Sequence, residues 1–141
     1  MRVYLFISIV FLFSACSDTR GKVIANIPEA SGISFCSKDK TFIVVNDEGT
    51  YYAMSKKGKI HHKINLGKYY LEGVVCEEEQ MIFALENKGI LIVNKETAKK
   101  KKVALDTMYK GKKLSLFDKK SGVEGIAKVD NILYLAKQSK K

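Results

Sequence analysis

The chain has 141 residues, of which 46% are hydrophobic, including seven Tyr and seven Phe. This length and composition suit one ordinary domain with a buried core and exclude an intrinsically disordered chain. Lys and Arg outnumber Asp and Glu by 25 to 15, which gives a formal net charge of +10. A nucleic-acid partner is nevertheless not expected, because only Arg2 and Arg20 are Arg and the Lys runs share no face with aromatic residues.

Residues 1–15 have the features of a secretory signal peptide. Arg2 precedes an apolar run that is shorter than the ~20 residues needed to span a bilayer. The run ends in Phe13-Ser14-Ala15-Cys16, which resembles a bacterial lipobox, although Phe13 replaces the usual Leu. We therefore expect a lipoprotein signal peptide over 1–15, a lipid such as palmitate on Cys16 and a tether over 16–21; an ordinary signal peptide is the alternative. The protein would then face the periplasm from the inner or the outer membrane.

Residues 22–66 carry a first series of strand signals. Lys22–Ile27 is predicted to be a strand that Pro28 ends, and its position suggests the outer strand of a preceding blade. Four more strands follow, separated by turns that are rich in Gly, Asn, Asp and Lys. These are expected at Ile33–Cys36, Thr41–Val45, Thr50–Met54 and Lys59–Leu66.

The same pattern recurs between residues 74 and 137. A second group of strands is expected at Val74–Cys76, Met81–Leu85, Ile90–Val93 and Lys101–Leu105. Residues 106–122 form a Lys-rich insertion, in which Leu114–Phe117 is either a short strand or a loop. A third copy begins at Val123 and stops after its second strand, at Ile132–Ala136.

Gly32, Gly73 and Gly125 occupy the same position in the three copies, 41 and 52 residues apart. A period of about 40–45 residues with several short strands is typical of β-propeller blades. The sequence therefore predicts an all-β chain, with blades of four antiparallel strands and a partial propeller over 22–141. About two and a half blades cannot close a ring of about four to eight blades, so we expect a truncated propeller, the front part of a longer one.

Four short motifs occur in a fixed order: Ala30-Ser31-Gly32-Ile33, Phe42–Glu48, Leu71-Glu72-Gly73-Val74 and Glu124-Gly125-Ile126-Ala127. They resemble the SdiA-regulated family of bacterial β-propellers, the YjiK- and CarP-like group of calcium-linked envelope proteins. The resemblance covers residues 28–137 and implies a propeller fold, an envelope location and a link to calcium. In two respects the chain departs from the family: the remaining blades are lacking, and Lys137 stands where Glu86 stands in the preceding copy.

Five residues with side-chain oxygens are candidate ligands for a cation. Glu72 and Glu124 each precede a repeat glycine on the inner strand, which lines the central channel of a propeller. Asn46, Asp47 and Glu86 follow second strands and could reach the same mouth. Oxygen ligands from several blades are what a hard cation such as Ca²⁺ requires. Alternatively, Glu72 and Glu124 accept hydrogen bonds from backbone amides of the adjoining blade, because buried acids need a partner.

The two histidines and two of the cysteines lead to further expectations. His61 and His62 are neighbours on a strand and should point to opposite faces, which favours surface positions over a shared metal. Cys36 and Cys76 follow equivalent strands but are one residue out of phase. An exported protein could pair them, yet the offset favours two buried thiols.

Three functions are compatible with these features. The leading hypothesis is a lipid-anchored envelope propeller that acts as a binding or scaffold module, for an envelope protein or a cation such as calcium, without catalysis. The second is a calcium-dependent esterase, lactonase or phytase-like hydrolase, which only the analogy of fold supports. The third is a truncated gene product without function.

Overall fold

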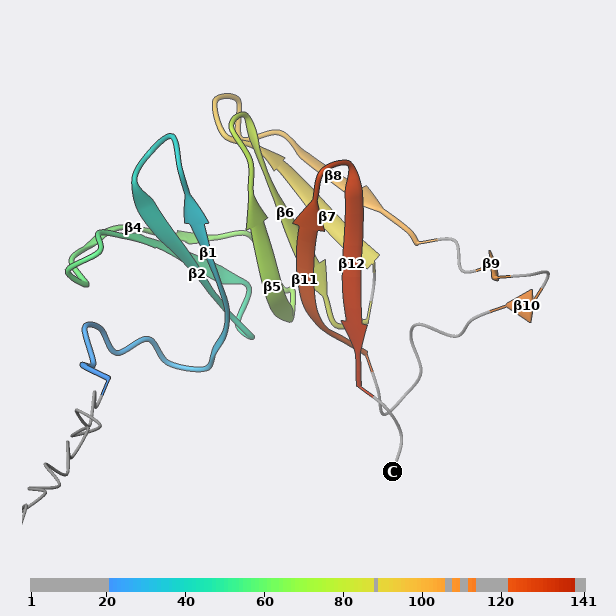
Figure 1. Ribbon diagram of the computed structural model, residues 1–141, viewed down its shortest axis with the longest axis horizontal. Coiled ribbons are helices and arrows are strands. Elements are labelled where there is room, and N and C mark those ends of the chain that lie inside the picture. Colours follow the sequence, from blue (N-terminus) through green and yellow to red (C-terminus); the bar gives the residue numbers. More distant parts are fainter. Residues whose placement is uncertain (1–20, 88, 106–107, 110–111, 114–121, 139–141) are drawn as a thin grey trace, which may run out of the picture.

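The computed structural model describes residues 21–87, 89–105, 108–109, 112–113 and 122–138 (Figure 1). The described residues form strands, turns and irregular segments, and contain no helix, so no helix among them could cross a membrane. The predicted signal peptide, Cys16 and Leu114–Phe117 lie outside the described residues.

Two four-stranded antiparallel sheets and one two-stranded sheet make up the body of the molecule. The first sheet has the order β1-β2-β3-β4, and its strands are β1 (Ala30–Cys36), β2 (Thr41–Asn46), β3 (Thr50–Met54) and β4 (Ile60–Asn65). The second has the order β5-β6-β7-β8, with β5 (Leu71–Cys76), β6 (Gln80–Leu85), β7 (Gly89–Asn94) and β8 (Lys100–Val103). The third pairs β11 (Val123–Val129) with β12 (Ile132–Lys137). These sheets confirm the all-β prediction and the predicted blades of four antiparallel strands.

The insertion between the second and third sheets adds one small element. Here β9 (Met108–Tyr109) pairs antiparallel with β10 (Lys112–Lys113). The three sheets stand side by side in Figure 1, with the first strand of each, β1, β5 and β11, toward the middle. Consecutive sheets therefore meet through their inner strands, as propeller blades do.

The prediction of a strand at Lys22–Ile27 is wrong, because residues 21–27 are irregular. A β-strand is stable only when a neighbouring strand satisfies its backbone groups. The first sheet already has its four strands, and no strand of the described residues pairs with 22–27. An apolar sequence ended by Pro28 was therefore not enough to make a strand.

All three inner strands carry a β-bulge at the same position. Leu71 pairs with Leu85 and Gly73 with Ala84, so Glu72 is an extra residue without a partner in the ladder. The same break falls at Ser31 in β1 and at Glu124 in β11. A bulge bends the strand locally and re-aims the side chain that it carries. The residue before each repeat glycine is thus the one that departs from the regular pleat.

The repeat glycines allow the inner strands to approach closely. A Cβ atom on Gly32 would lie only 2.6 Å from the Cα of Gly73. A Cβ on Gly73 would lie 3.0 Å from the Cγ2 of Ile126 in β11. Successive inner strands therefore pack backbone against backbone at these positions. The core fills the space between the first two sheets, where the rings of Tyr51 and Phe83 are 5.8 Å apart.

Cys36 and Cys76 form a disulfide, which corrects the prediction of two buried thiols; their Cα atoms are 5.3 Å apart. Gly32 faces the second blade and Gly73 faces the third, so equivalent residues all face the following blade. Successive side chains of a strand point to opposite faces. A disulfide between consecutive blades therefore needs one cysteine an even number of residues after its glycine, which faces the following blade, and one an odd number after its glycine, which faces the preceding blade. Cys36 lies four residues after Gly32 and Cys76 three after Gly73. The offset taken as evidence against pairing is therefore what permits it.

We expect the change Gly32→Ala to destabilise the protein, because its new Cβ would overlap backbone that cannot move aside without separating two blades. The free energy of unfolding, measured by urea denaturation of the full chain, should fall by about 1–3 kcal/mol. Gly21→Ala is the matched control, since a Cβ there meets nothing within 4 Å. Equal stability of the two variants would contradict the close approach of β1 and β5.

Candidate functional site

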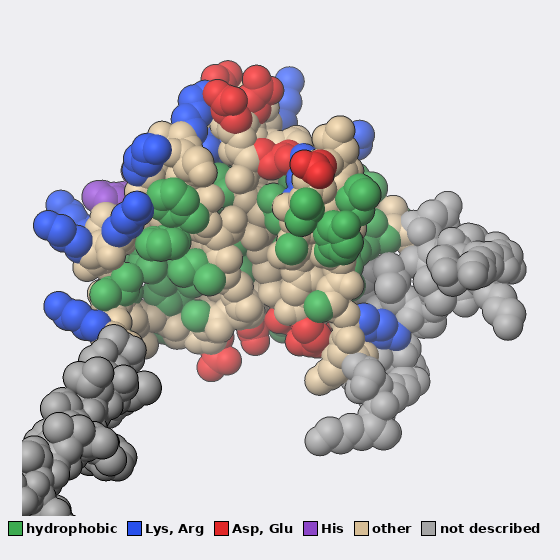
Figure 2. Space-filling view, in the orientation of Figure 1, with side chains coloured by type: hydrophobic (Ala, Val, Ile, Leu, Met, Phe, Trp, Pro, Cys, Tyr) green, Lys and Arg blue, Asp and Glu red, His purple; other side chains and the backbone are tan. Residues whose placement is uncertain are grey.

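Acidic side chains gather at the end of the blades where the inner strands begin. They lie along the lower edge of the molecule in Figure 2. Two of them, Glu72 and Glu124, occupy the bulge position of β5 and β11. Their counterpart in β1 is Ser31, whose hydroxyl donates a hydrogen bond to the carbonyl of Leu71 in the next blade. The bulges thus place two carboxylates and one hydroxyl at equivalent positions of three blades.

The residue directly after β2, β6 and β12 occupies a second position that repeats in the three blades. The backbone amide of Asp47 donates to Glu29 at 3.3 Å, and that of Glu86 donates to Tyr70 at 3.1 Å. Gln138 makes the same hydrogen bond, to Gly122 at 3.1 Å. Gln138 is therefore the counterpart of Glu86. This corrects the sequence alignment, which placed Lys137 there; Lys137 pairs with Val123, as Leu85 pairs with Leu71.

Glu72 is electrostatically coupled to three other carboxylates. Burial is the largest cause that raises its pKa, and the negative charges of Asp47, Glu124 and Glu86 raise it further, from 4.5 to about 7. The contributing residues come from the β2–β3 turn, from β11 and from the segment after β6. Four of the five residues predicted as ligands are thus brought into one electrostatic neighbourhood by three different blades.

Asn46, the fifth predicted residue, is fully buried and its side chain is already engaged. Its Nδ2 donates to the carbonyl of Pro28 at 3.3 Å, and its Oδ1 accepts the amide of Thr50 at 3.0 Å. Both bonds hold the turn that carries Asp47. The structure therefore gives Asn46 a positioning part in this turn, next to the carboxylates.

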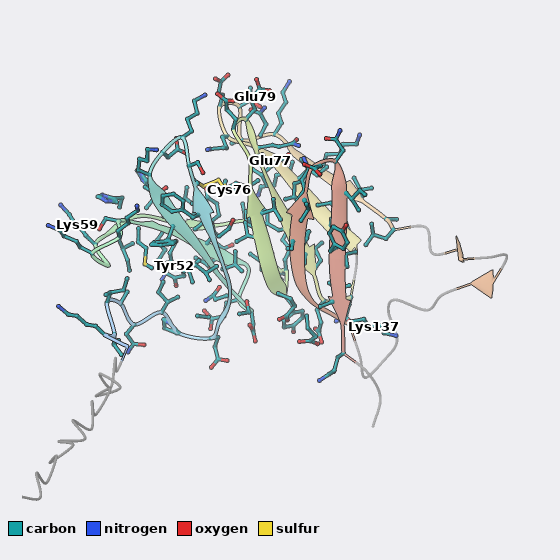
Figure 3. All side chains as sticks on the ribbon, in the orientation of Figure 1. Tyr52, Lys59, Cys76, Glu77, Glu79 and Lys137 are labelled. Atoms are coloured by element: carbon teal, nitrogen blue, oxygen red, sulfur yellow. A yellow bond between two sulfur atoms is a disulfide. The ribbon has the colours of Figure 1, made fainter. Side chains whose placement is uncertain are left out.

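The opposite end of the blades differs in its charge balance. There, lysines from the next blade pair with acids of the preceding one, as in Lys95–Asp39 and Lys128–Glu77. Hydrogen bonds from Gln80 and Lys128 lower the pKa of Glu77, which Figure 3 labels in the upper part of the molecule, below Glu79. The partners of Lys38, Lys95 and Lys128 are Glu78, Asp39 and Glu77, so these three ion pairs do not involve Asp47, Glu72, Glu86 or Glu124. The lysines that pair with acids across the blades at the upper end thus leave the four carboxylates at the lower end to other partners.

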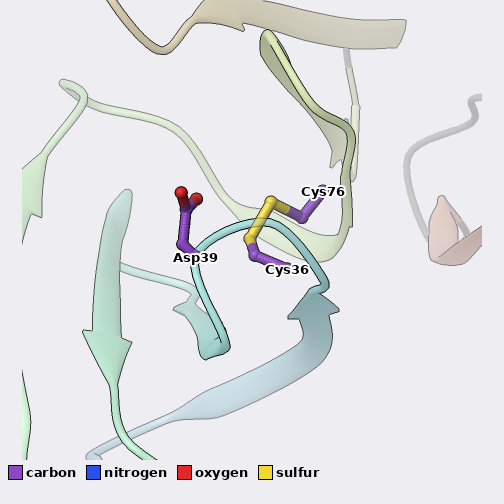
Figure 4. Close-up of side chains that lie close together, drawn as sticks. All are labelled: Cys36, Asp39 and Cys76. Atoms are coloured by element: carbon purple, nitrogen blue, oxygen red, sulfur yellow. A yellow bond between two sulfur atoms is a disulfide. The ribbon is translucent and has the colours of Figure 1, made fainter.

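The four carboxylates do not form a finished coordination shell. Within the described residues, the one group of metal-ligand atoms that lie within 4.8 Å of one another is Cys36, Asp39 and Cys76 (Figure 4). That group is not a thiolate site, because its two sulfurs are joined in the disulfide. A cation at the lower end would therefore have to draw the carboxylates together.

A hollow of about 350 Å³ adjoins the acidic end. It is lined by Asp47, Glu48, Lys68, Tyr69 and Tyr70, which belong to the β2–β3 turn and to the connection between the first two blades. Lys68 brings one positive charge to this hollow, but it is not among the groups that shift the pKa of Glu72.

The histidines lie away from these acids. His61 and His62 are exposed on β4, as the prediction of surface positions states. The argument from opposite faces does not hold, however, because the β3–β4 ladder shifts register between Ala53 and Met54 and leaves His61 as an extra residue. Both histidines line the same cavity between the first two blades.

Comparisons with known proteins relate nearly the whole chain to one family. A family model described as SdiA-regulated matches residues 14–140. No curated protein matches the chain in sequence. Among solved structures, the crystal structure of the computationally designed protein Ika4 matches with a TM-score of 0.49 and 11% sequence identity. That alignment covers 82% of this chain and 92% of the designed one.

Replacing Glu72 by Gln should change how stability depends on pH. The raised pKa means that Glu72 contributes most stability below pH 4.5 and that this contribution is lost as pH rises through about 7. In chelator, the parent protein should lose stability across this range, and Glu72→Gln should lose less and be the more stable at pH 8. Glu78→Gln, at the opposite end, is the control and should follow the parent. Parallel curves for Glu72→Gln and the parent, from urea denaturation at each pH, would show that the carboxylates are not coupled.

Proposed function

Because the chain belongs to the SdiA-regulated family, we propose that it is a lipid-anchored envelope protein whose acidic blade end binds a divalent cation, calcium. The observation that supports this most strongly is the coupling of Glu72 to Asp47, Glu86 and Glu124, which come from three successive blades. Like charges held in a half-buried position raise the free energy of the ionised state. A cation bound between them would remove that penalty.

The donors present fit calcium better than a softer metal. Carboxylate oxygens are hard ligands, and Ca²⁺ accepts six to eight oxygens at flexible angles. Glu72 and Asp47 would hold the ion, and Glu86 and Glu124 would approach it on binding. Water would complete the shell. Asn46 would act on the site through the turn that carries Asp47, since its own oxygen accepts the amide of Thr50.

Calcium binding should raise the melting temperature of the full chain. A ligand that binds only the folded state stabilises it by about 2.7 kcal/mol when its free concentration is a hundred times its dissociation constant. The double variant Glu72→Gln, Glu124→Gln should lose most of the rise. Glu78→Gln with Glu79→Gln makes the same charge change at the opposite end and should keep it.

Two outcomes would change the proposed function. If millimolar calcium leaves the melting temperature unchanged, or if the double variant responds as the parent does, the glutamates are structural and the cation proposal fails. If the parent also hydrolyses a phosphoester or a lactone in the presence of calcium, and the double variant does not, the site belongs to a hydrolase.

The membrane anchor is tested separately, at Cys16. The apolar run before Phe13-Ser14-Ala15-Cys16 supports lipid attachment, and the family match from residue 14 includes this cysteine. Cells fed a clickable fatty acid should label the parent protein, and Cys16→Ser should abolish the label. An unlabelled parent that is released as a processed protein would overturn the anchor and leave the cation site untouched.

A further inference from the structure

A second cavity lies between the first two blades, on the side where His61 and His62 are found. Its volume is about 440 Å³, within the range of about 300–1,000 Å³ for small-molecule pockets. Ile43, Ala53 and His62 form one row across β2, β3 and β4, because Ile43 pairs with Ala53 and Ala53 with His62. Met81 of β6 and Tyr51 of β3 also line it. The walls are therefore mainly aliphatic and aromatic, with the two imidazoles on the exposed strand.

Tyr51 is the residue of this cavity whose side chain could bind a ligand through a hydrogen bond. Its side chain lines the cavity, only 9% of the residue is exposed, and its ring packs on Phe83. Its hydroxyl has no hydrogen-bond partner within the part of the chain that the structure describes. Burial raises the pKa of Tyr51, so the phenol stays neutral and remains a donor. A buried hydroxyl without a partner has lost its hydration without gaining a hydrogen bond, and an acceptor in the cavity would supply that bond.

The charged residues at the cavity wall cancel each other. Lys95 is ion-paired with Asp39, and its ammonium group also lies 3.4 Å from the carbonyl oxygen of Glu77, to which it donates. The pair therefore leaves little net charge to attract an ionic ligand. The thioether of Met81 and the ring of Tyr51 are, by contrast, good partners for an aromatic ring.

We propose that this cavity binds a small, uncharged aromatic molecule with one hydrogen-bond acceptor, and that the Tyr51 hydroxyl donates to that acceptor. The ring would lie between Ile43 and Ala53 on one side and Met81 on the other. This site is separate from the acidic end, and it does not depend on calcium.

Two fluorinated probes of matched shape test the proposal on the full chain. The probe 4-fluoroacetophenone has a carbonyl acceptor, and 1-ethyl-4-fluorobenzene has the same size without one. Fluorine NMR line widths should show that the ketone binds about fivefold more tightly, the effect of one net hydrogen bond. Tyr51→Phe should remove that preference and leave the affinity for the ethyl compound within twofold. Tyr52→Phe is the matched control, because Tyr52 is buried on the same strand but does not line the cavity.

Filling the cavity gives a second, independent readout. Ala53→Leu should weaken both probes at least tenfold, while the calcium response at the acidic end persists. The proposal is overturned if neither probe binds the parent at millimolar concentration, or if Tyr51→Phe binds the ketone as the parent does. It is also overturned if a folded Ala53→Leu variant, identified by an unchanged melting transition, still binds both probes.

Discussion

The contact between Gly32 and Gly73 sets the distance at which the blades meet. With a Cβ at Gly32 only 2.6 Å from the Cα of its neighbour, the two inner strands are as close as backbones without side chains allow. Gly73 repeats the arrangement toward Ile126 of the third blade. The Ser31 hydroxyl and the Cys36–Cys76 disulfide then join the same two strands before and after the glycine contact. A disulfide that closes a loop of this length contributes about 2–4 kcal/mol, so the first two blades are held as one unit.

This close packing also determines where charge accumulates. Each inner strand begins with a bulge one residue before its glycine, and in β5 and β11 that residue is Glu. Because the strands converge there, Glu72 and Glu124 cannot move far apart. The ends of β2 and β6 add Asp47 and Glu86 to the same region. At the other end, ion pairs such as Lys128–Glu77 join neighbouring blades, so similar acids there stabilise the contact between blades.

The sequence predicted the blades because their signals are local. Alternating apolar residues, glycine turns and the repeated glycine identify strands and their order without knowledge of packing. The bulges were missed, although a polar residue before each of Gly32, Gly73 and Gly125 was visible, because a bulge is a property of two paired strands. The disulfide was missed for a related reason: the phase of Cys36 and Cys76 was compared as if they shared one sheet. Lys22–Ile27 has strand composition, but composition does not supply a partner.

The positions of the candidate ligands were easier to predict than these details, and their binding of a cation stays a prediction. Glu72, Glu124, Asp47 and Glu86 were identified from their repeat positions, and equivalent positions of successive blades necessarily lie at the same end. The burial of Asn46 and the equivalence of Gln138 with Glu86 depend on hydrogen bonds between strand ends, which residue spacing does not reveal. The burial of Tyr51 against Phe83 of the second blade, and the lack of a hydrogen-bond partner for its hydroxyl among the described residues, depend on packing between blades, which the sequence does not reveal.

The convergence of carboxylates is tested most directly by the titration of Glu72 itself. The carboxyl carbon of Glu72 can be followed by ¹³C NMR in the full chain, assigned through Glu72→Gln, first with chelator and then with calcium. We predict a pKa of about 7 in chelator, because burial and then the charges of Asp47, Glu124 and Glu86 oppose its ionisation, and a clear fall when calcium is added. An ordinary pKa near 4.5 in chelator would contradict the account, since it would mean that Glu72 is neither buried between the blades nor close to the acids of its neighbours.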